Sequence, residues 1–273
     1  MSNDPDESTT DTIFSLSLNR DAGPTIIFLH GLCSNHTEYT HVLPLLADHH
    51  LLAVDLPGHS QSSAIRPFSL AGAAEQVARV IERRAHDRRA HVVGCSLGGF
   101  VALDLALRRP ELVESLFVTG AAPFAGFRRW FAEHPRVLYC LQAPLSKYSP
   151  GWVDGAICAW IGLQKPAGLR EEERRNFGRN LLTDAFTGIA QFVAEDLRAL
   201  RVRTLTVAGE AQDDVPATRA MAELLREGCS ESQAAVVRGG AHAWDLQFPE
   251  LFAKSVKAWI DGDDLPDGLV LAP

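Results

Sequence analysis

The chain has 273 residues, of which 46% are hydrophobic and 22% are charged, and its formal net charge is −8. This length allows one large core, or one core with a modest insertion. The negative charge argues against broad binding to nucleic acids, because contacts with phosphates require clustered Lys and Arg.

The first twelve residues are acidic and polar and lack the apolar segment of a signal peptide, and we expect residues 1–12 to be a flexible leader. The five cysteines are widely spaced and include no C-x-x-C pair, which favours free thiols in a reducing compartment. No apolar run approaches the roughly 20 residues that a membrane-spanning helix needs. These features predict a cytoplasmic protein without a membrane span.

Up to residue 120, apolar runs alternate with helical patterns. Strands are expected at 13–18, 25–30, 50–56, 91–94 and 112–120. In the segment 13–18, apolar and polar residues alternate, as in a half-buried strand. The segments 25–30 and 50–56 are continuously apolar, as in strands buried on both faces. One helix is expected at 69–85, where Ser69 is a candidate N-cap, and a second at 98–109.

Strands that alternate with helices predict an α/β fold, with a mostly parallel sheet covered by helices on both sides. The alternation lapses over 121–197, where Trp and Phe residues lie among helical fragments. These fragments are expected to break at Pro135, Pro144, Pro150 and Pro166. Such an aromatic-rich interruption predicts a helical cap, inserted into the core and laid over one end of the sheet.

The alternation resumes after the predicted cap. The expected elements are strands at 201–209 and 232–240 and helices at 217–227 and 249–260. The core is therefore expected to comprise residues 13–120 and 198–261. Residues 262–273 are expected to form a loose C-terminal tail.

Three glycines surround one serine where a predicted strand meets a predicted helix, in Gly94-Cys95-Ser96-Leu97-Gly98-Gly99. In the G-x-S-x-G pattern the serine lies on a strained turn, and the glycines permit tight packing around it. The turn would bring the Ser96 hydroxyl to a helix N-terminus, where backbone N–H groups favour developing negative charge. We predict that Ser96 is a nucleophile; the alternative is a glycine-rich turn with an incidental serine.

A serine nucleophile needs a base to accept its proton. Of the ten histidines, His242 alone follows a late predicted strand through a glycine loop, at the sheet edge of Ser96. Trp244 and Phe248 could exclude solvent beside it. His30 and His59 belong to turns, and four others lie in charged or surface-like contexts: His49, His50, His86 and His91. His242 is the predicted general base, with a structural histidine as the alternative.

A carboxylate beside the histidine would hold its tautomer and stabilise the imidazolium. The loop after the strand at 201–209 supplies Asp213, which is the predicted acid, and Asp214, which is the alternate. The chain order is then Ser, Asp, His. Both aspartates could instead merely cap the helix that begins near Pro216.

Five segments of this sequence together resemble the α/β-hydrolase superfamily, over about residues 13–260. They are FLHGLCSN (28–35), DLPGHSQS (55–62), GCSLGG (94–99), GEAQDDVP (209–216) and GGAHAW (239–244), in the family's order. The resemblance implies an α/β-hydrolase fold and a small, capped, carboxylesterase-like serine hydrolase. One departure concerns the acid, because Gln212 holds the family's usual position and Asp213 follows it.

The resemblance also places an oxyanion hole on the backbone N–H groups of Leu32 and Leu97, and it makes His30 a structural member of its turn. The implied reaction is acyl transfer to Ser96, followed by hydrolysis with water that His242 activates. A serine at this position argues against the dehalogenase and epoxide hydrolase branches, which carry an aspartate there.

The aromatic cap predicts a small-molecule substrate with an apolar or aromatic acyl or alcohol group. Candidate pocket residues are Phe124, Phe127, Trp130, Phe131, Trp152, Trp160 and Trp244. A carboxylic ester is the predicted substrate, and the same triad could cleave a lactone, a thioester or a C–C bond beside a carbonyl. A cofactor-free lyase or oxygenase and a non-catalytic small-molecule sensor remain as alternatives.

The sequence contains no metal-ligand cluster, phosphate-cradling loop or dinucleotide fingerprint, and we therefore expect neither a cofactor nor a metal. It predicts no nucleic-acid partner and assigns no oligomeric state.

Overall fold

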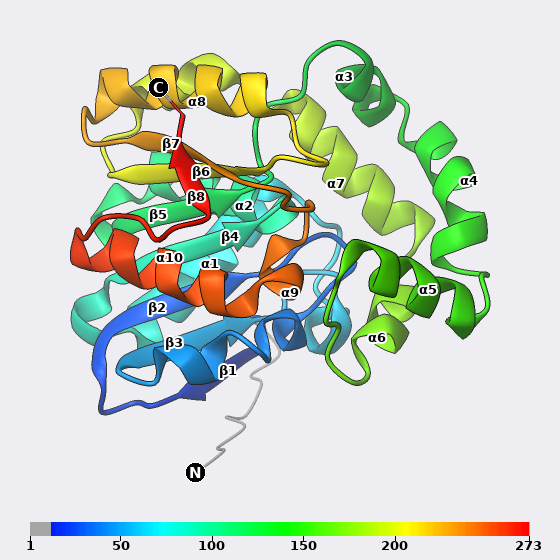
Figure 1. The fold of residues 1–273 in the computed structure, drawn as a ribbon, viewed down its shortest axis with the longest axis horizontal. Helices are drawn as coiled ribbons and strands as arrows, with labels where there is room; N and C mark the ends of the chain where they lie inside the picture. Colours follow the sequence, from blue (N-terminus) through cyan, green and yellow to red (C-terminus); the bar gives the residue numbers. More distant parts are fainter. Residues whose placement is uncertain (1–11, 273) are drawn as a thin grey trace.

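The computed structural model describes residues 12–272, and eight strands form one sheet in the order β1-β3-β2-β4-β5-β6-β7-β8 (Figure 1). The strands are β1 (Ser15–Leu18), β2 (Gly23–Leu29), β3 (His49–Val54), β4 (Ala90–Cys95), β5 (Val113–Thr119), β6 (Thr204–Gly209), β7 (Gln233–Val237) and β8 (Leu269–Leu271). The six strands from β3 to β7 in this order pair in parallel, and β1 and β8 are antiparallel edge strands. The predicted mostly parallel sheet is therefore confirmed.

Helices cover both faces of the sheet. On one face, α1 (Leu70–Arg84), α2 (Leu97–Arg108) and α8 (Val215–Gly228) pack on strand residues such as Ile27 and Leu29. On the other, α9 (Trp244–Gln247) and α10 (Pro249–Asp261) pack on Ile26 and Phe28. Successive strand residues point to opposite faces, so a strand buried on both sides needs the continuous apolar run that the sequence shows.

The predicted helix at 69–85 matches α1 closely. Ser69 caps it, since its side chain accepts a hydrogen bond from the Gly72 N–H group at 3.1 Å. The helix buries Ala73, Val77 and Ile81 against the sheet, as their spacing predicts.

Five helices, which we call the inserted helices, lie between β5 and β6 in the chain. They are α3 (Gly126–Glu133), α4 (Pro135–Ser146), α5 (Gly151–Ile161), α6 (Leu169–Asn176) and α7 (Arg179–Gln191). Figure 1 shows them together at one end of the strands, on the right of the view. Pro144 does not break a helix as predicted but lies in the last turn of α4. Pro144 has no N–H group to donate to the Cys140 carbonyl, four residues earlier. Cys140 is exposed, so its carbonyl is accessible to water.

The C-terminal residues differ from the predicted loose tail, because β8 pairs with β7 and extends the sheet. The Ala272 N–H group also donates to the Ala234 carbonyl at 2.8 Å. Without β8, the backbone groups on one side of β7 would lack partners in the sheet. This pairing explains why the chain returns to the sheet after α10.

The predicted surface setting of His49 and His50 is wrong, since both are buried in β3. The His50 ring bonds to the hydroxyls of Ser17 and Thr25, each at 3.0 Å. Burial, with nearby His86 and arginines, lowers the pKa of His50 to about 4, which keeps the ring neutral.

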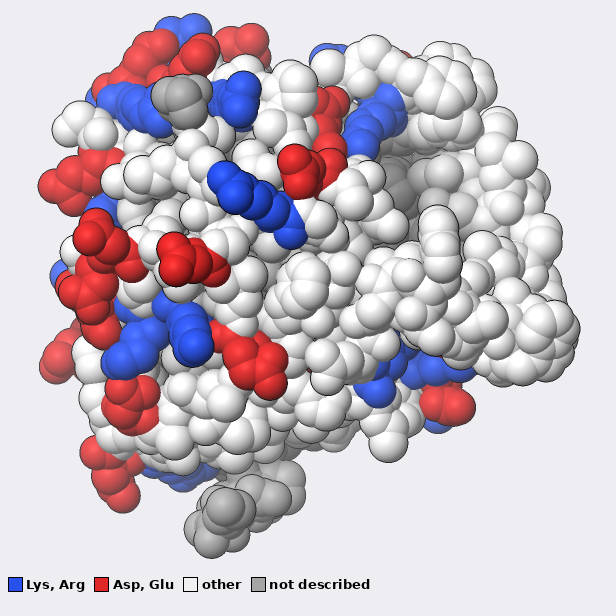
Figure 2. All heavy atoms as spheres, viewed as in Figure 1, with Lys and Arg blue, Asp and Glu red and all other residues white. Residues whose placement is uncertain are grey.

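All five cysteines lie in the described part of the chain and are free thiols. No helix among residues 12–272 is long and apolar enough to cross a membrane. Figure 2 shows that charged side chains in this view gather over the sheet and its flanking helices, whereas the inserted helices present a mostly uncharged surface. Most of the predicted leader lies outside the described residues.

Candidate active site

Ser96 occupies a sharp turn between β4 and α2, with φ of 52° and ψ of −114°. The flanking glycines are required by close backbone contacts. A Cβ atom at Gly98 would lie 2.1 Å from the Leu29 carbonyl oxygen, and one at Gly94 would lie 2.5 Å from that of Gly98. The Ser96 N–H group donates to the Thr119 carbonyl at 2.8 Å, which fixes the turn against the end of β5.

Asp213 and His242 form a direct pair, with 2.6 Å between Oδ1 and Nδ1. The Asp213 side chain is 5% exposed, and its Oδ2 accepts the Gly209 N–H at 2.8 Å. Asp214 has a different role, because its side chain caps α8 by accepting the Ala217 N–H at 3.0 Å. The two candidate acids are therefore distinct in the structure, one beside the imidazole and one at a helix N-terminus.

Two glutamines that the sequence interpretation did not select hold the loop that carries His242. Gln212 Oε1 accepts the His242 N–H at 2.9 Å, and Gln247 Oε1 accepts the Ala241 N–H at 2.7 Å. Gln247 also donates to the Ile161 carbonyl of α5 at 2.9 Å. The unusual Gln212 at the family's acid position was the only sequence signal for this arrangement.

The His242 ring lies over Gly120, immediately after β5. A Cβ atom at Gly120 would lie 2.5 Å from Cε1 and 2.8 Å from Nδ1 of the ring, and Gly120 has a φ of +62°. Ser96 and His242 thus both adjoin the end of β5, where Thr119 binds the Ser96 N–H. The Ser96 hydroxyl makes no hydrogen bond to the ring in this structure, and such bonds often tighten only when substrate binds.

The segment after β2 brings further backbone groups to Ser96. A Cβ atom at Gly31 would lie 3.7 Å from the Ser96 Cβ, and Leu32 follows directly. Leu97 is the first residue of α2, so its N–H has no partner within the helix. Among residues 12–272, neither the Leu32 N–H nor the Leu97 N–H is used by another hydrogen bond. Both N–H groups are available to a ligand.

His30 and His59 position this segment and are unsuited to act as bases. Nε2 of His30 accepts the Leu56 N–H at 3.0 Å, and Nε2 of His59 accepts the Cys33 N–H at 3.1 Å. The proton of each ring therefore lies on Nδ1, which donates to a carbonyl. Burial lowers the pKa of His30 to about 4 and that of His59 to about 3. Both rings are neutral structural donors and acceptors.

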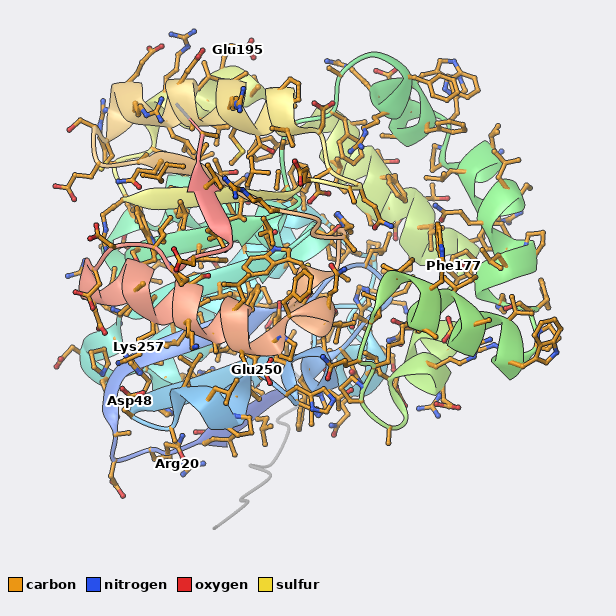
Figure 3. All side chains as sticks on the ribbon, viewed as in Figure 1. Arg20, Asp48, Phe177, Glu195, Glu250 and Lys257 are labelled. Atoms are coloured by element: carbon orange, nitrogen blue, oxygen red, sulfur yellow. The ribbon has the colours of Figure 1, made fainter. Side chains whose placement is uncertain are left out.

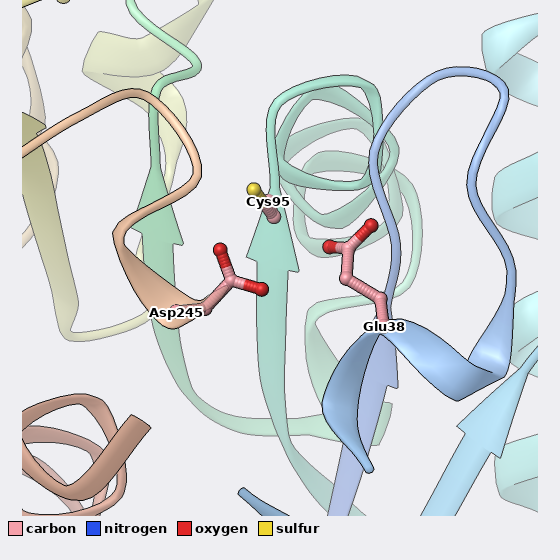
Figure 4. A group of neighbouring side chains, drawn as sticks. All are labelled: Glu38, Cys95 and Asp245. Atoms are coloured by element: carbon pink, nitrogen blue, oxygen red, sulfur yellow. The ribbon is translucent and has the colours of Figure 1, made fainter. Parts of the chain in front are cut away.

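Three titratable side chains gather beneath the Ser96 turn: Glu38, Cys95 and Asp245 (Figure 4). All three are buried, and their donor atoms lie within 4.8 Å of one another. Burial raises the pKa of both carboxyls, and their mutual proximity adds to the effect at Glu38. A divalent cation could use these atoms as ligands, but the raised pKa values favour protonated, neutral groups.

A cavity of about 570 Å³ opens between the inserted helices and the Leu32–Cys33 segment. Its apolar walls comprise Leu141, Leu145, Ile157, Phe177, Leu182 and Phe186. Figure 3 shows Phe177 among the inserted helices. The apolar part of the lining therefore consists of aliphatic side chains and two phenylalanines, and polar and charged residues line the rest.

None of the aromatic residues predicted to line the pocket is among the residues that line this cavity. Four of them are solvent-exposed, with relative exposures of 73% for Phe127, 43% for Trp130, 75% for Trp152 and 87% for Trp160. Phe124 packs on Phe100 of α2, and Phe131 packs on Phe127 and Trp130 in α3. Trp244 is fully buried. Its indole N–H donates to Thr119 Oγ1, and its ring packs on Phe252.

Asn176, at the end of α6, joins the inserted helices to the segment around Leu32. Its side-chain amide donates to the carbonyls of Cys33 and Ser34 and to the Ser60 hydroxyl, each at 3.0 Å. Its oxygen accepts the Ser60 N–H at 2.8 Å. The inserted helices are thereby fixed beside the carboxyl ends of β2 and β3.

Comparison with known proteins agrees with this architecture. Residues 26–255 match the alpha/beta hydrolase family, and the chain belongs to that family. An AB hydrolase superfamily protein of Gibberella zeae is 33% identical over 97% of this chain and 89% of its own length.

Two further proteins are similar over most of the chain. A pimeloyl-[acyl-carrier protein] methyl ester esterase of Neisseria meningitidis serogroup B is 29% identical over 89% of this chain and 95% of its own length. The crystal structure of a hydrolase from Pseudomonas aeruginosa PA01 has a TM-score of 0.69 at 20% identity, covering 94% of this chain and 97% of that one.

Proposed function

We propose that this protein is a serine hydrolase that cleaves carboxylic esters of small apolar molecules through an acyl-enzyme on Ser96. The observation that carries the proposal is the His242–Asp213 pair at 2.6 Å, placed over the strand end that anchors the strained Ser96 turn. The similarity to a protein named as a methyl ester esterase supports an ester as the substrate.

In the first half-reaction, the Ser96 hydroxyl attacks the ester carbonyl carbon while His242 accepts its proton at Nε2. Asp213 stabilises the resulting imidazolium through Nδ1. The oxyanion accepts hydrogen bonds from the Leu32 and Leu97 N–H groups, which have no other partner among the described residues. Collapse of the intermediate releases the alcohol, which takes the proton from His242.

In the second half-reaction, water replaces the alcohol. His242 removes a proton from the water as it attacks the acyl carbon, and Ser96 is then expelled with the same proton. The inserted helices serve as a cap in this proposal: the apolar walls of their cavity hold the substrate chain and exclude bulk water from it.

Covalent labelling tests the proposal directly. A fluorophosphonate probe is expected to label the wild-type protein at Ser96, and labelling is expected to disappear in Ser96→Ala. Hydrolysis of short-chain nitrophenyl esters should follow the same pattern. A folded wild-type protein that neither labels nor turns over any ester would contradict the proposal and favour a sensor or lyase.

A further inference from the structure

The cavity between the inserted helices and Leu32 has a polar end as well as apolar walls. Five charged side chains line it: Asp154, Lys165, Arg170, Glu173 and Arg174, which we call the charged cluster. They come from α5, α6 and the connection between them, whereas Leu32 and Cys33 lie on the core side of the cavity. A ligand that reaches from Leu32 into the cavity therefore meets apolar walls and charged groups.

The charged cluster has an excess of one positive charge, because three cations face two carboxylates. Lys165 pairs with Asp154 at 3.3 Å and with Glu173 at 2.6 Å, and Arg170 pairs with Asp154 at 2.7 Å. These contacts use both carboxylates. Among the described residues, Arg174 has no carboxylate within 4.0 Å.

Arg174 is also incompletely hydrogen-bonded. Its Nε and Nη2 donate to the Lys147 carbonyl at 3.1 and 2.8 Å, and Nη2 also donates to the Ser149 carbonyl at 2.9 Å. In the described part of the chain, Nη1 has no partner. A partly buried guanidinium with free N–H donors is suited to bind a carboxylate.

We infer that the charged cluster is an anion subsite centred on Arg174, and that the preferred substrate is an ester carrying a carboxylate beyond an apolar chain. This inference rests on the proposed function and names the substrate class for the same site. The apolar walls hold the chain, Leu32 adjoins the ester carbonyl, and Arg174 Nη1 binds the distant carboxylate.

The test compares charged and neutral esters of the same length. The charged substrates are methyl half-esters of dicarboxylic acids from succinate to sebacate, and each is compared with the methyl ester of the matching monocarboxylic acid. At the best length, kcat/KM for the half-ester should exceed that for the neutral ester by about tenfold or more. Acetate esters of ω-hydroxy acids show whether the carboxylate belongs on the alcohol part instead.

Variants separate recognition from a structural role. Arg174→Met should reduce the preference for the half-ester to about one while changing neutral-ester kcat/KM by less than about threefold. Arg174→Gln removes the charge but retains an N–H donor for the Lys147 carbonyl, so it serves if Arg174→Met folds poorly. Arg175→Met is the matched control, since Arg175 is exposed on the same helix, and it should retain the preference.

Binding provides a readout that does not depend on turnover. The best-length dicarboxylate should raise the Tm of Ser96→Ala, and Arg174→Met should abolish the increase. Turnover of neutral esters without a carboxylate preference would overturn the anion subsite and leave the proposed function intact. Absence of both labelling and turnover would instead refute the proposed function, and dicarboxylate binding that depends on Arg174 would still support the subsite.

Discussion

Asp213 binds the His242 ring through Oδ1 at 2.6 Å and the Gly209 N–H through Oδ2 at 2.8 Å. Both carboxylate oxygens are therefore used as acceptors, one by the imidazole and one by the backbone of β6. This double use fixes the carboxylate plane and leaves the Nδ1 proton of His242 pointing at it. A residue with one acceptor oxygen cannot satisfy both donors.

Asp213→Asn tests this relationship because an amide supplies only one acceptor. We expect kcat for a nitrophenyl ester to fall by about 10³–10⁴-fold, since the imidazole loses the partner that holds its tautomer. Asp214→Asn is the control: its side-chain oxygen still caps α8, so kcat should stay near wild type. Equal losses in the two variants would refute Asp213 as the acid.

Gly120 is expected to determine where the His242 ring lies. In Gly120→Ala the new methyl group would lie 2.5 Å from the ring Cε1, and the ring must move. We expect a loss of kcat of more than about 100-fold, because small misplacements of catalytic groups have effects of this size. Steady-state kinetics measures the loss of activity, and thermal unfolding measures any loss of stability separately.

Gly262→Ala is the control for backbone strain at Gly120. Gly262 has a φ of +77° at the end of α10, and its nearest atom to a Cβ is 3.9 Å away. It should lose about 1 kcal/mol of stability, as a left-handed residue does, without loss of activity. Comparable kcat losses in both variants would show that strain, and not displacement of the ring, is responsible.

The buried carboxyl of Glu38 makes stability depend on pH. Burial raises the pKa of Glu38 above the ordinary value of about 4.3, so above that pH the unfolded chain loses a proton that the folded chain keeps. The free energy of unfolding therefore falls as pH rises, by up to about 1.4 kcal/mol per pH unit for this group. The decline stops above the raised, folded-state pKa.

Glu38→Gln should remove this contribution while retaining an acceptor for the Gly31 N–H. Urea unfolding at pH 5, 6 and 7 measures the slope for both proteins. The variant is expected to lose less stability than wild type over this range. Parallel slopes would show that Glu38 does not hold its proton in the folded protein.

Asn176 is expected to couple the inserted helices to the core. Asn176→Ala leaves the Cys33 and Ser34 carbonyls without this donor, which should cost about 1–3 kcal/mol in unfolding free energy. Ester kcat/KM should also fall, because Leu32 precedes these residues. Asn180→Ala, at an exposed position on α7, is the control and should change neither quantity. Wild-type behaviour of Asn176→Ala would refute the coupling.

The central sheet was predictable because its apolar runs and helical spacings are local properties of the sequence. Strand β8 was not, because three residues carry little periodicity and their pairing depends on the free edge of β7. The burial of His50 was missed for a similar reason. Its hydroxyl partners, Ser17 and Thr25, lie on two other strands, and only the folded sheet brings the three residues together.

At the site, the turn around Ser96 could be predicted because strained backbone demands glycine at fixed positions. The lining of the cavity could not be predicted from aromatic content, since composition does not reveal which face of a helix points inward. Trp152 and Trp160 of α5 are exposed, whereas Ile157 of the same helix lines the cavity. The pair of Glu38 and Asp245 also escaped prediction, because the two residues are distant in the chain and carry no shared motif.

The contacts of Asn176 also bear on protein engineering within this family. Grafting the inserted helices onto another family member, in order to transfer substrate preference, would separate the Asn176 amide from the Cys33 and Ser34 carbonyls to which it donates. Such a chimera needs the segment after β2 from the same donor protein. Recognition and catalysis would then be exchanged as one module.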